Sequence, residues 1–275
     1  GVPSPSDSRA SGVGTLRRVL PLQATFDSYR QALARGEFTL HYQPRVRLTN
    51  GEVTGYEALL RRSGPEMTQS PSAILDRAEQ SAFGSQLGEW VLRAAARQSA
   101  IWRERGVTVP IAVNLSSSQL YGDQLVVLLE ELVREDPVLG THLELELAEP
   151  LFGLHVEDTT RILREVARLG LSVQVDHFGS GGAHLHRLGQ MPVRALKIDR
   201  SVVSAAPGSA EAAMLVKATI ALSRAMELNV IAVGVETAAQ YNFLKSWGCP
   251  EAQGFLFARP SPPGEVAQAW KERDA

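Results

Sequence analysis

Short apolar runs alternate along the chain with longer stretches that have the 3.6-residue periodicity of amphipathic helices. The apolar runs predict strands at 38–42, 53–60, 111–115, 143–148, 172–176, 195–199, 229–234 and 253–257. The periodic stretches predict helices at 26–38, 72–82, 86–105, 117–135, 156–169, 210–227, 237–247 and 264–273. Short strands that alternate with helices indicate βαβ units, and therefore an α/β protein with a mainly parallel sheet.

Eight strands in a chain of 275 residues favour a closed (β/α)8 barrel, and an open doubly wound sheet is the alternative. The first stretch, GVPSPSDSRASGVG, is rich in Pro, Ser and Gly and lacks an apolar periodicity. We therefore expect residues 1–20 to be a disordered linker or tail. The abrupt start suggests that the folded part is the C-terminal domain of a longer protein.

The amino-acid composition argues against several classes of protein and site. The hydrophobic fraction of 44% is ample for a core, and the net charge of −2 without a like-charge run argues against a nucleic-acid polymer as partner. A single cysteine, Cys249, excludes an intrachain disulfide and a multi-cysteine metal cluster, and it fits a reducing cytoplasm. No apolar run reaches the ~18–20 residues that span a bilayer, and no secretory signal precedes the first helix.

Polar side chains interrupt or follow several predicted strands where those strands end. They are Asn114, Glu146, Glu149, Asp176, Lys197, Glu236 and Gln253. Active groups of α/β barrels gather at the C-terminal ends of several strands. Carboxylates with an amide and a lysine have the composition of a hard-cation site, in which Mg²⁺, Mn²⁺ or Ca²⁺ would polarise a phosphoryl oxygen and activate water.

Each of these acids taken alone has a simpler interpretation as a helix cap, a surface charge or half of an ion pair. We expect Asp199 to have such a local role. Glu144 alternates with Glu146 on one strand, so it shares the same face and is expected to line the pocket or its rim. The functional interpretation depends on several strands contributing together.

Eight segments in order make the sequence recognisable. They are HYQP (41–44), YEALLR (56–61), VNLS (113–116), LELELAEP (143–150), DHFGSG (176–181), LKIDR (196–200), GVET (234–237) and QGFLFARP (253–260). The chain resembles the EAL domain family of cyclic di-GMP phosphodiesterases and their inactive relatives, with 21–275 as the EAL domain. Eight ordered segments are far more specific than a single short motif.

The resemblance implies a modified (β/α)8 barrel of EAL type with one antiparallel strand, expected to be the strand that bears Glu57. It also implies a pocket for the bis-(3′→5′) cyclic dinucleotide of guanosine. In active members, two divalent cations, Mg²⁺ or Mn²⁺, prepare a water that opens the ring to linear pGpG.

The resemblance also assigns roles to individual residues. Glu57, Asn114, Glu146 and Asp176 match metal ligands. Lys197 matches a lysine near the attacking water, and with Glu57 and Glu236 it forms the expected catalytic set. Glu149 matches a glutamate that braces the loop after Asp176. Ligand-contacting positions are Gln43, Leu59, Arg61 and Gln253 together with Glu236, and the Arg61 guanidinium suits a phosphate.

Two positions depart from the family pattern at the metal centre. His177 stands where active members have a second aspartate, and Val233 stands where they have the first glutamate of an E-G-V-E motif. Valine neither ligates a cation nor takes a proton, and loss of a positioned base typically costs ~10²–10⁴ in rate. Imidazole can ligate Mn²⁺ or Zn²⁺ but is a poor ligand for Mg²⁺. The loop 177–185, HFGSGGAHL, also lacks the family's tyrosine and serines.

Three functions remain open at this point. The first is a degenerate EAL domain that acts as a cyclic di-GMP receptor with absent or weak hydrolysis, and that needs no metal. The second is a metal-dependent phosphodiesterase in which His177 serves as a ligand. The third is a ligand-free protein-interaction module. We expect a bacterial cytoplasmic setting, an upstream sensory or GGDEF-type domain or another protein as partner, and a homodimer.

Overall fold

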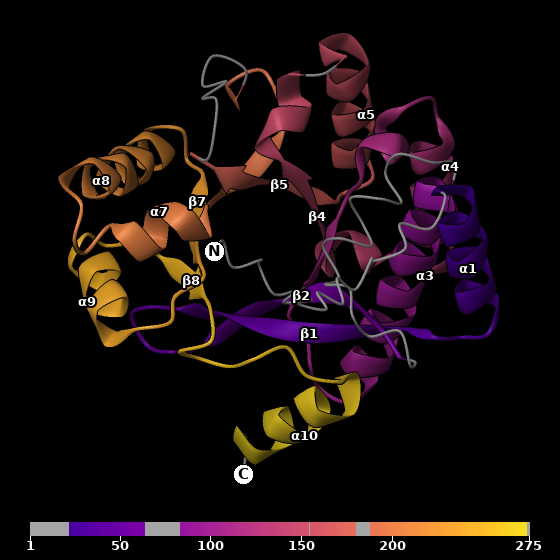
Figure 1. Cartoon of the computed structure of the whole chain (residues 1–275), viewed down its shortest axis with the longest axis horizontal. Coiled ribbons are helices and arrows are strands. Elements are labelled where there is room, and N and C mark those ends of the chain that lie inside the picture. Colours follow the sequence, from indigo (N-terminus) through magenta and orange to yellow (C-terminus); the bar gives the residue numbers. More distant parts are fainter. Residues whose placement is uncertain (1–21, 64–82, 154, 180–187, 274–275) are drawn as a thin grey trace, which may run out of the picture.

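The computed structural model describes residues 22–63, 83–153, 155–179 and 188–273 (Figure 1). The strands are β1 (Phe38–Arg47), β2 (Val53–Arg62), β3 (Ile111–Asn114), β4 (Leu143–Ala148), β5 (Ser172–Phe178), β6 (Val193–Ile198), β7 (Asn229–Val233) and β8 (Glu251–Gln253). The α-helices are α1 (Leu22–Ala34), α3 (Phe83–Glu104), α4 (Gln124–Glu135), α5 (Val156–Arg168), α7 (Arg200–Ala205), α8 (Ala210–Ala225), α9 (Ala238–Ser246) and α10 (Pro263–Arg273). Three 3₁₀ turns are η1 (Ser117–Leu120), η2 (Leu139–Thr141) and η3 (Glu149–Gly153).

The eight strands close into a barrel in sequence order, β1 to β8, and β1 pairs with both β2 and β8. The strands from β2 to β8 are parallel, whereas β1 is antiparallel to both of its neighbours. This confirms the modified barrel with one antiparallel strand. The expectation that Glu57 lies on that strand was wrong, because Glu57 lies on β2. A short hairpin connection joins β1 to β2, so the two must run in opposite directions, and β1 is the strand that also opposes β8.

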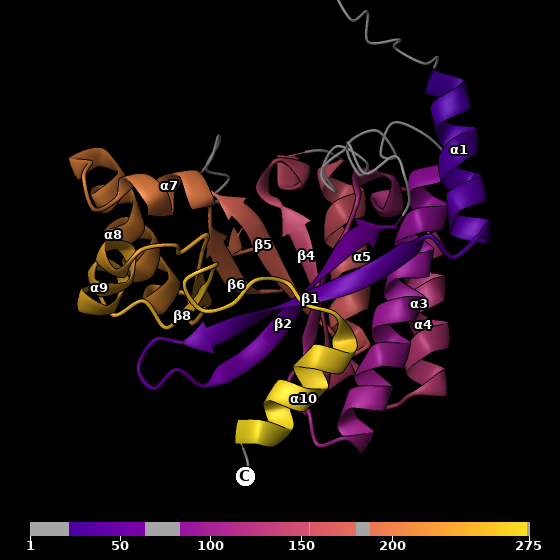
Figure 2. The same cartoon turned by 60° about the horizontal axis from the view of Figure 1, so that its bottom comes forward.

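The strands are buried on both faces because helices cover the outside of the barrel (Figures 1 and 2). On β4, for example, Leu143, Leu145 and Leu147 point outward and are fully buried against the helical layer. Trp102 of α3 is buried beside the β1–β2 hairpin, with its ring 4.7 Å from that of Tyr42, centroid to centroid. Alternate residues of each strand are therefore left to face the barrel interior.

Some predicted elements differ from the observed ones. The helix predicted at 26–38 is α1, which ends at Ala34, because Gly36 adopts a φ of 69° and turns the chain into β1. The helix predicted at 117–135 is divided into η1 and α4 around Gly122, whose φ is 68°. The strand predicted at 253–257 is β8, which ends at Gln253. It begins at Glu251, so the two ranges share only Gln253, and the chain then turns, with the Phe257 amide donating to the Gly254 carbonyl at 3.1 Å.

One further difference concerns a helix. The short helix α7 was not predicted; Asp199 caps it by accepting a hydrogen bond from the Ser201 amide at 2.8 Å. This confirms the local role expected for Asp199. The helix predicted at 72–82 and the tail 1–20 lie outside the described residues. In the described part, every helix is too short or too polar to cross a membrane.

Candidate cyclic dinucleotide site

A buried lysine lies among three carboxylates at the C-terminal ends of the parallel strands. The Lys197 Nζ is 2.5 Å from Glu146 Oε2, 3.0 Å from Glu57 Oε2 and 3.7 Å from Asp176 Oδ1. These side chains come from β6, β4, β2 and β5, and the Lys197 side chain is only 1% exposed. The fold thus brings together Glu146, Asp176 and Lys197, which the sequence placed at separate strand ends. Glu57, which the family resemblance matched to a metal ligand, joins them, and we call these four residues the acid cluster.

The three carboxylates of the acid cluster surround one ammonium group, and this arrangement shifts the pKa values of Lys197, Glu146 and Glu57. Burial opposes ionisation of Lys197, but attraction to Asp176, Glu146 and Glu57 raises its pKa above the ordinary value. Burial and repulsion from Glu57 raise the pKa of Glu146 well above normal, by more than Lys197 lowers it. Burial also disfavours the Glu57 carboxylate, yet attraction to Lys197 and hydrogen bonds from Gln253 and Asn114 lower its pKa. Of the two glutamates, Glu146 is therefore the one whose environment disfavours the charged form.

Three amide side chains surround Glu57. Asn114 on β3 donates its Nδ2 hydrogen to Glu57 Oε1 at 2.8 Å, and Gln253 on β8 donates to Glu57 Oε2 at 2.7 Å. Gln253 also donates to Gln43 Oε1 at 3.1 Å, while Gln43 on β1 donates to the Ala258 carbonyl at 3.0 Å. All of these predicted residues converge, and the hydrogen bonds fix the orientation of Glu57.

Leu59 and Arg61 extend the inward face of β2 beyond Glu57, because alternate residues of a strand share a face. Both side chains are half-buried. The Arg61 guanidinium donates to the Leu60 carbonyl at 2.8 Å, and burial lowers its pKa by more than the Glu57 charge raises it. Arg61 therefore presents a partly desolvated guanidinium on the cluster side of the barrel.

His177 makes contacts that the sequence did not predict. It has a left-handed backbone with φ of 58°, its Nδ1 is 2.8 Å from Asp199 Oδ2, and its Nε2 is 3.5 Å from Asp176 Oδ2. Burial lowers the pKa of His177, but attraction to Asp176 and the hydrogen bond with Asp199 raise it above the ordinary value overall. The side chain is 58% exposed and connects the end of β5 to the cap of α7.

The start of the loop after β5 is held by Glu149. Its Oε2 accepts a hydrogen bond from the Gly179 amide at 3.0 Å, and the side chain is buried. This contact has the form of the expected bracing role. Residues 180–187, where the loop sequence departs from the family, lie outside the described residues.

The end of β7 carries Val233 and Glu236. Val233 is paired in register with Gln253, so its two methyl groups share the inward face with that amide. Glu236 is exposed and forms an ion pair with Arg200, Nη2 to Oε1, at 2.7 Å. Gly234, with φ of 77°, lies against the Arg200 side chain, where an added Cβ would be 2.3 Å from Cγ. Glu236 is thus at the rim and paired, away from the buried acid cluster.

The donor set of Glu57, Asn114, Glu146 and Asp176 fits a hard divalent cation chemically, because three carboxylates and an amide provide oxygen ligands. The Lys197 ammonium, however, lies among the three carboxylates. Within the described ranges, no group of three or more His, Cys, Asp or Glu side chains is arranged to hold a metal ion; the three carboxylates are arranged around the ammonium instead. A cation that bound there would supply Lewis acidity, and it would compete with Lys197 for the same oxygens.

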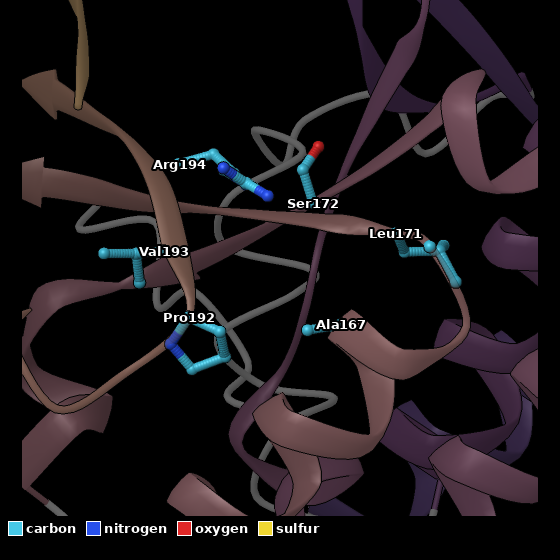
Figure 3. A pocket seen from close by; sticks show the side chains of 7 residues that line it. Ala167, Leu171, Ser172, Pro192, Val193 and Arg194 are labelled. Atoms are coloured by element: carbon cyan, nitrogen blue, oxygen red, sulfur yellow. The ribbon is translucent and has the colours of Figure 1, made fainter. Parts of the chain in front are cut away.

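A separate hollow of about 300 Å³ lies at the opposite end of the barrel, where β5 and β6 begin (Figure 3). It is lined by Ala167, Gly170, Leu171, Ser172, Pro192, Val193 and Arg194. The acid cluster is at the other ends of these strands, so this hollow is no part of the site.

The model of the EAL domain family matches residues 27–260. The chain belongs to the EAL domain family. The family resemblance inferred from eight short segments is thereby confirmed.

Two curated relatives of the EAL chain are longer proteins. MucR of Pseudomonas aeruginosa, a bifunctional diguanylate cyclase/cyclic di-GMP phosphodiesterase, is 38% identical over 235 residues, which are 85% of this chain and 34% of MucR. PdeR of Escherichia coli, a cyclic di-GMP phosphodiesterase, is 35% identical over 245 residues, which are 89% of this chain and 37% of PdeR. The chain spans about a third of the length of these relatives.

Solved structures agree with the fold. The PaMucR phosphodiesterase in its c-di-GMP complex superposes with a TM-score of 0.84 at 36% identity, covering 88% of this chain and 99% of that one. The EAL domain of Mycobacterium smegmatis DcpA gives a TM-score of 0.71 at 30% identity, covering 86% and 97%. The EAL chain therefore belongs to a cyclic di-GMP signalling and phosphodiesterase family.

Proposed function

We propose that this EAL domain is a cyclic di-GMP receptor in which hydrolysis is absent or weak. One observation carries the proposal: Val233 stands on the inward face at the C-terminal end of β7, in register with Gln253. An aliphatic side chain there cannot take a proton from water or organise a cation. Glu236, the nearest acid along the chain, is exposed and paired with Arg200, so it does not replace the missing group.

His177 supports the same proposal. Its Nδ1 contacts Asp199 and its exposed ring replaces a carboxylate, so the local negative charge that would hold a second cation is reduced. Two cations ~3.5–4 Å apart repel each other and depend on surrounding anions. Losing two carboxylates from the shell therefore weakens the metal-dependent reaction more than it weakens ligand binding.

Binding without metal is also reasonable on charge grounds. The ligand carries two phosphate charges, which free carboxylates would repel. Lys197 neutralises part of the cluster, and burial raises the pKa of Glu146, which disfavours a further negative charge there. Arg61 adds a guanidinium that can donate bidentately to a phosphate.

Calorimetry with cyclic di-GMP in EDTA tests the receptor proposal directly, alongside chromatography for pGpG in Mg²⁺ and in Mn²⁺. A receptor binds in EDTA and forms little or no pGpG in either metal. Turnover at a rate ordinary for phosphodiesterases would refute it. No binding at high micromolar ligand in any condition would also refute it and would favour a ligand-free interaction module.

A weak Mn²⁺-dependent phosphodiesterase is the second candidate. It is favoured by the 3.5 Å approach of His177 Nε2 to Asp176, because imidazole and carboxylate together can ligate Mn²⁺. Turnover in Mn²⁺ but not Mg²⁺, lost in His177→Ala, would support it. Under the receptor proposal, Val233→Glu combined with His177→Asp is expected to create hydrolysis that the parent lacks.

A further inference from the structure

A second ring of inward-facing residues lies beneath the acid cluster. Each member is two residues from a site residue on the same strand, and therefore on the same face. The ring comprises Arg45, Gly55, Glu144, Gln174 and Glu251, which precede or follow Gln43, Glu57, Glu146, Asp176 and Gln253. None of these five was predicted as part of an internal network; Glu144 was expected at the pocket or its rim but lies below it.

Arg45 is the centre of this ring. Its Nη1 is 3.0 Å from Glu144 Oε2, and its Nε is 2.8 Å from Glu251 Oε2. Gln174 donates to the same Glu144 oxygen at 2.5 Å. The Arg45 side chain is 8% exposed, so its charge is desolvated and is compensated by carboxylates from β4 and β8.

Gly55 makes room for the guanidinium. An added Cβ on Gly55 would lie 2.7 Å from Arg45 Nη2 and 3.3 Å from the Pro110 carbonyl oxygen. The hairpin register pairs Arg45 with Gly55, so the arginine can fold across its neighbour into the barrel. The interior is thus shaped around a second buried cation, in addition to Lys197.

We propose that Arg45 is a specificity-determining residue that shifts the preference of the pocket above it from divalent cations toward the anionic dinucleotide. The inference rests on the proposed receptor function and deepens it. Arg45 contacts neither ligand, so its effect is electrostatic and acts through the low-dielectric barrel interior.

The distance makes such an effect substantial. Arg45 contacts Glu144, which is two residues from Glu146 on β4, and two residues along a strand span about 7 Å. Charges at that separation interact appreciably inside a protein and are little screened by salt. Burial lowers the pKa of Arg45, but Glu144, Glu251 and, more weakly, Glu146 raise it overall, so Arg45 experiences the charge of the acid cluster.

Arg45→Met tests the proposal with two titrations of the full chain. Without the buried charge, cyclic di-GMP in EDTA should bind about tenfold more weakly, whereas Mn²⁺ without nucleotide should bind about tenfold more tightly. A residue that merely supports the fold would weaken both ligands together. Arg47→Met is the matched control, because Arg47 is on the same strand but is exposed and paired with Glu52, and both affinities should stay unchanged.

Two further variants separate charge from packing. Arg45→Lys keeps the charge and should retain the parent's preference. Glu251→Gln removes one carboxylate of the ring with little change in shape, so it should tighten cyclic di-GMP and weaken Mn²⁺, the reverse of Arg45→Met. This variant keeps the proposal testable if Arg45→Met fails to fold.

The outcomes distinguish this inference from the receptor proposal. Failure of the parent to bind cyclic di-GMP in EDTA refutes the receptor, while the Mn²⁺ titrations still report on Arg45. Arg45→Met without a gain in Mn²⁺ affinity, or Glu251→Gln shifting both ligands in the same direction, overturns the role of Arg45.

Discussion

Replacing Lys197 by methionine should destabilise this EAL domain strongly, since the lysine contacts all three carboxylates of the acid cluster. Its side chain is 1% exposed, and methionine fills a similar volume without the charge. Breaking a buried ion pair by removing one partner costs about 3–5 kcal/mol, because the other charge stays buried and uncompensated. For a domain of this size, that corresponds to a fall in Tm of roughly 6–20 °C.

Urea denaturation followed by circular dichroism measures the free energy of unfolding of parent and variant. The loss should be smaller at pH 6 than at pH 8, because the raised pKa of Glu146 lets it take a proton and reduces the uncompensated charge. Lys217→Met is the control. Lys217 lies 3.9 Å from the centroid of the half-exposed Trp247 ring, and losing that cation–π contact should cost only about 0.5–1 kcal/mol.

A divalent cation should partly rescue Lys197→Met. With the ammonium removed, Glu57, Glu146 and Asp176 are free to ligate Mn²⁺, so added Mn²⁺ should raise the Tm of the variant more than that of the parent. A loss below about 1 kcal/mol, the value of an exposed pair, would refute the reasoning. So would equal stabilisation of parent and variant by Mn²⁺.

Three further outcomes follow from individual residues. Gly234→Ala should lower the free energy of unfolding by about 1–3 kcal/mol, because its φ is 77° and the new Cβ would lie 2.3 Å from Arg200 Cγ. Gly106→Ala is the control: its φ is 86° but the space around it is open, so this variant should lose less stability. Burial raises the pKa of Cys249 to about 12, so the native chain should resist a thiol reagent at pH 8 and react with one equivalent after unfolding; rapid native labelling would contradict this. Cyclic di-GMP in EDTA should bind more tightly at pH 6 than at pH 8, because the pKa of His177 is raised and its protonated form prevails toward lower pH. His177→Gln should reduce this pH dependence of the affinity, and an unchanged pH dependence would exclude His177 as its source.

The alternation of strands and helices predicted the barrel because both signals are local. Each of the eight predicted strands overlaps an observed strand, the last of them at Gln253 alone. Two of the predicted helices differ from the observed ones where a glycine with positive φ redirects the chain, at Gly36 and Gly122. The identity of the antiparallel strand could not be predicted in the same way. It depends on the pairing of β1 with β8, which are far apart in the sequence and leave no local pattern.

The sequence allowed the acid cluster to be predicted but not the second ring around Arg45, because only the first has a recognisable sequence pattern. Acids at the ends of apolar strands are conspicuous, and the family motifs identified their partners. Arg45, Gln174 and Glu251 lie within strands, where they have the appearance of solvent-facing residues in a two-residue alternation. Only the closed barrel shows that this face is interior, and that Arg45 finds its carboxylates on β4 and β8.

The reversed direction of β1 has a mechanical consequence. Phe38, the first residue of β1, pairs with Arg62, the last residue of β2, so the chain enters the barrel at the end that carries the acid cluster. The helix α1 precedes β1 by only three residues and stands beside α3 toward that same end (Figure 2). A pull or rotation applied to α1 would therefore be transmitted through β1 first to the end of the barrel that carries the acid cluster, before it reached the opposite end.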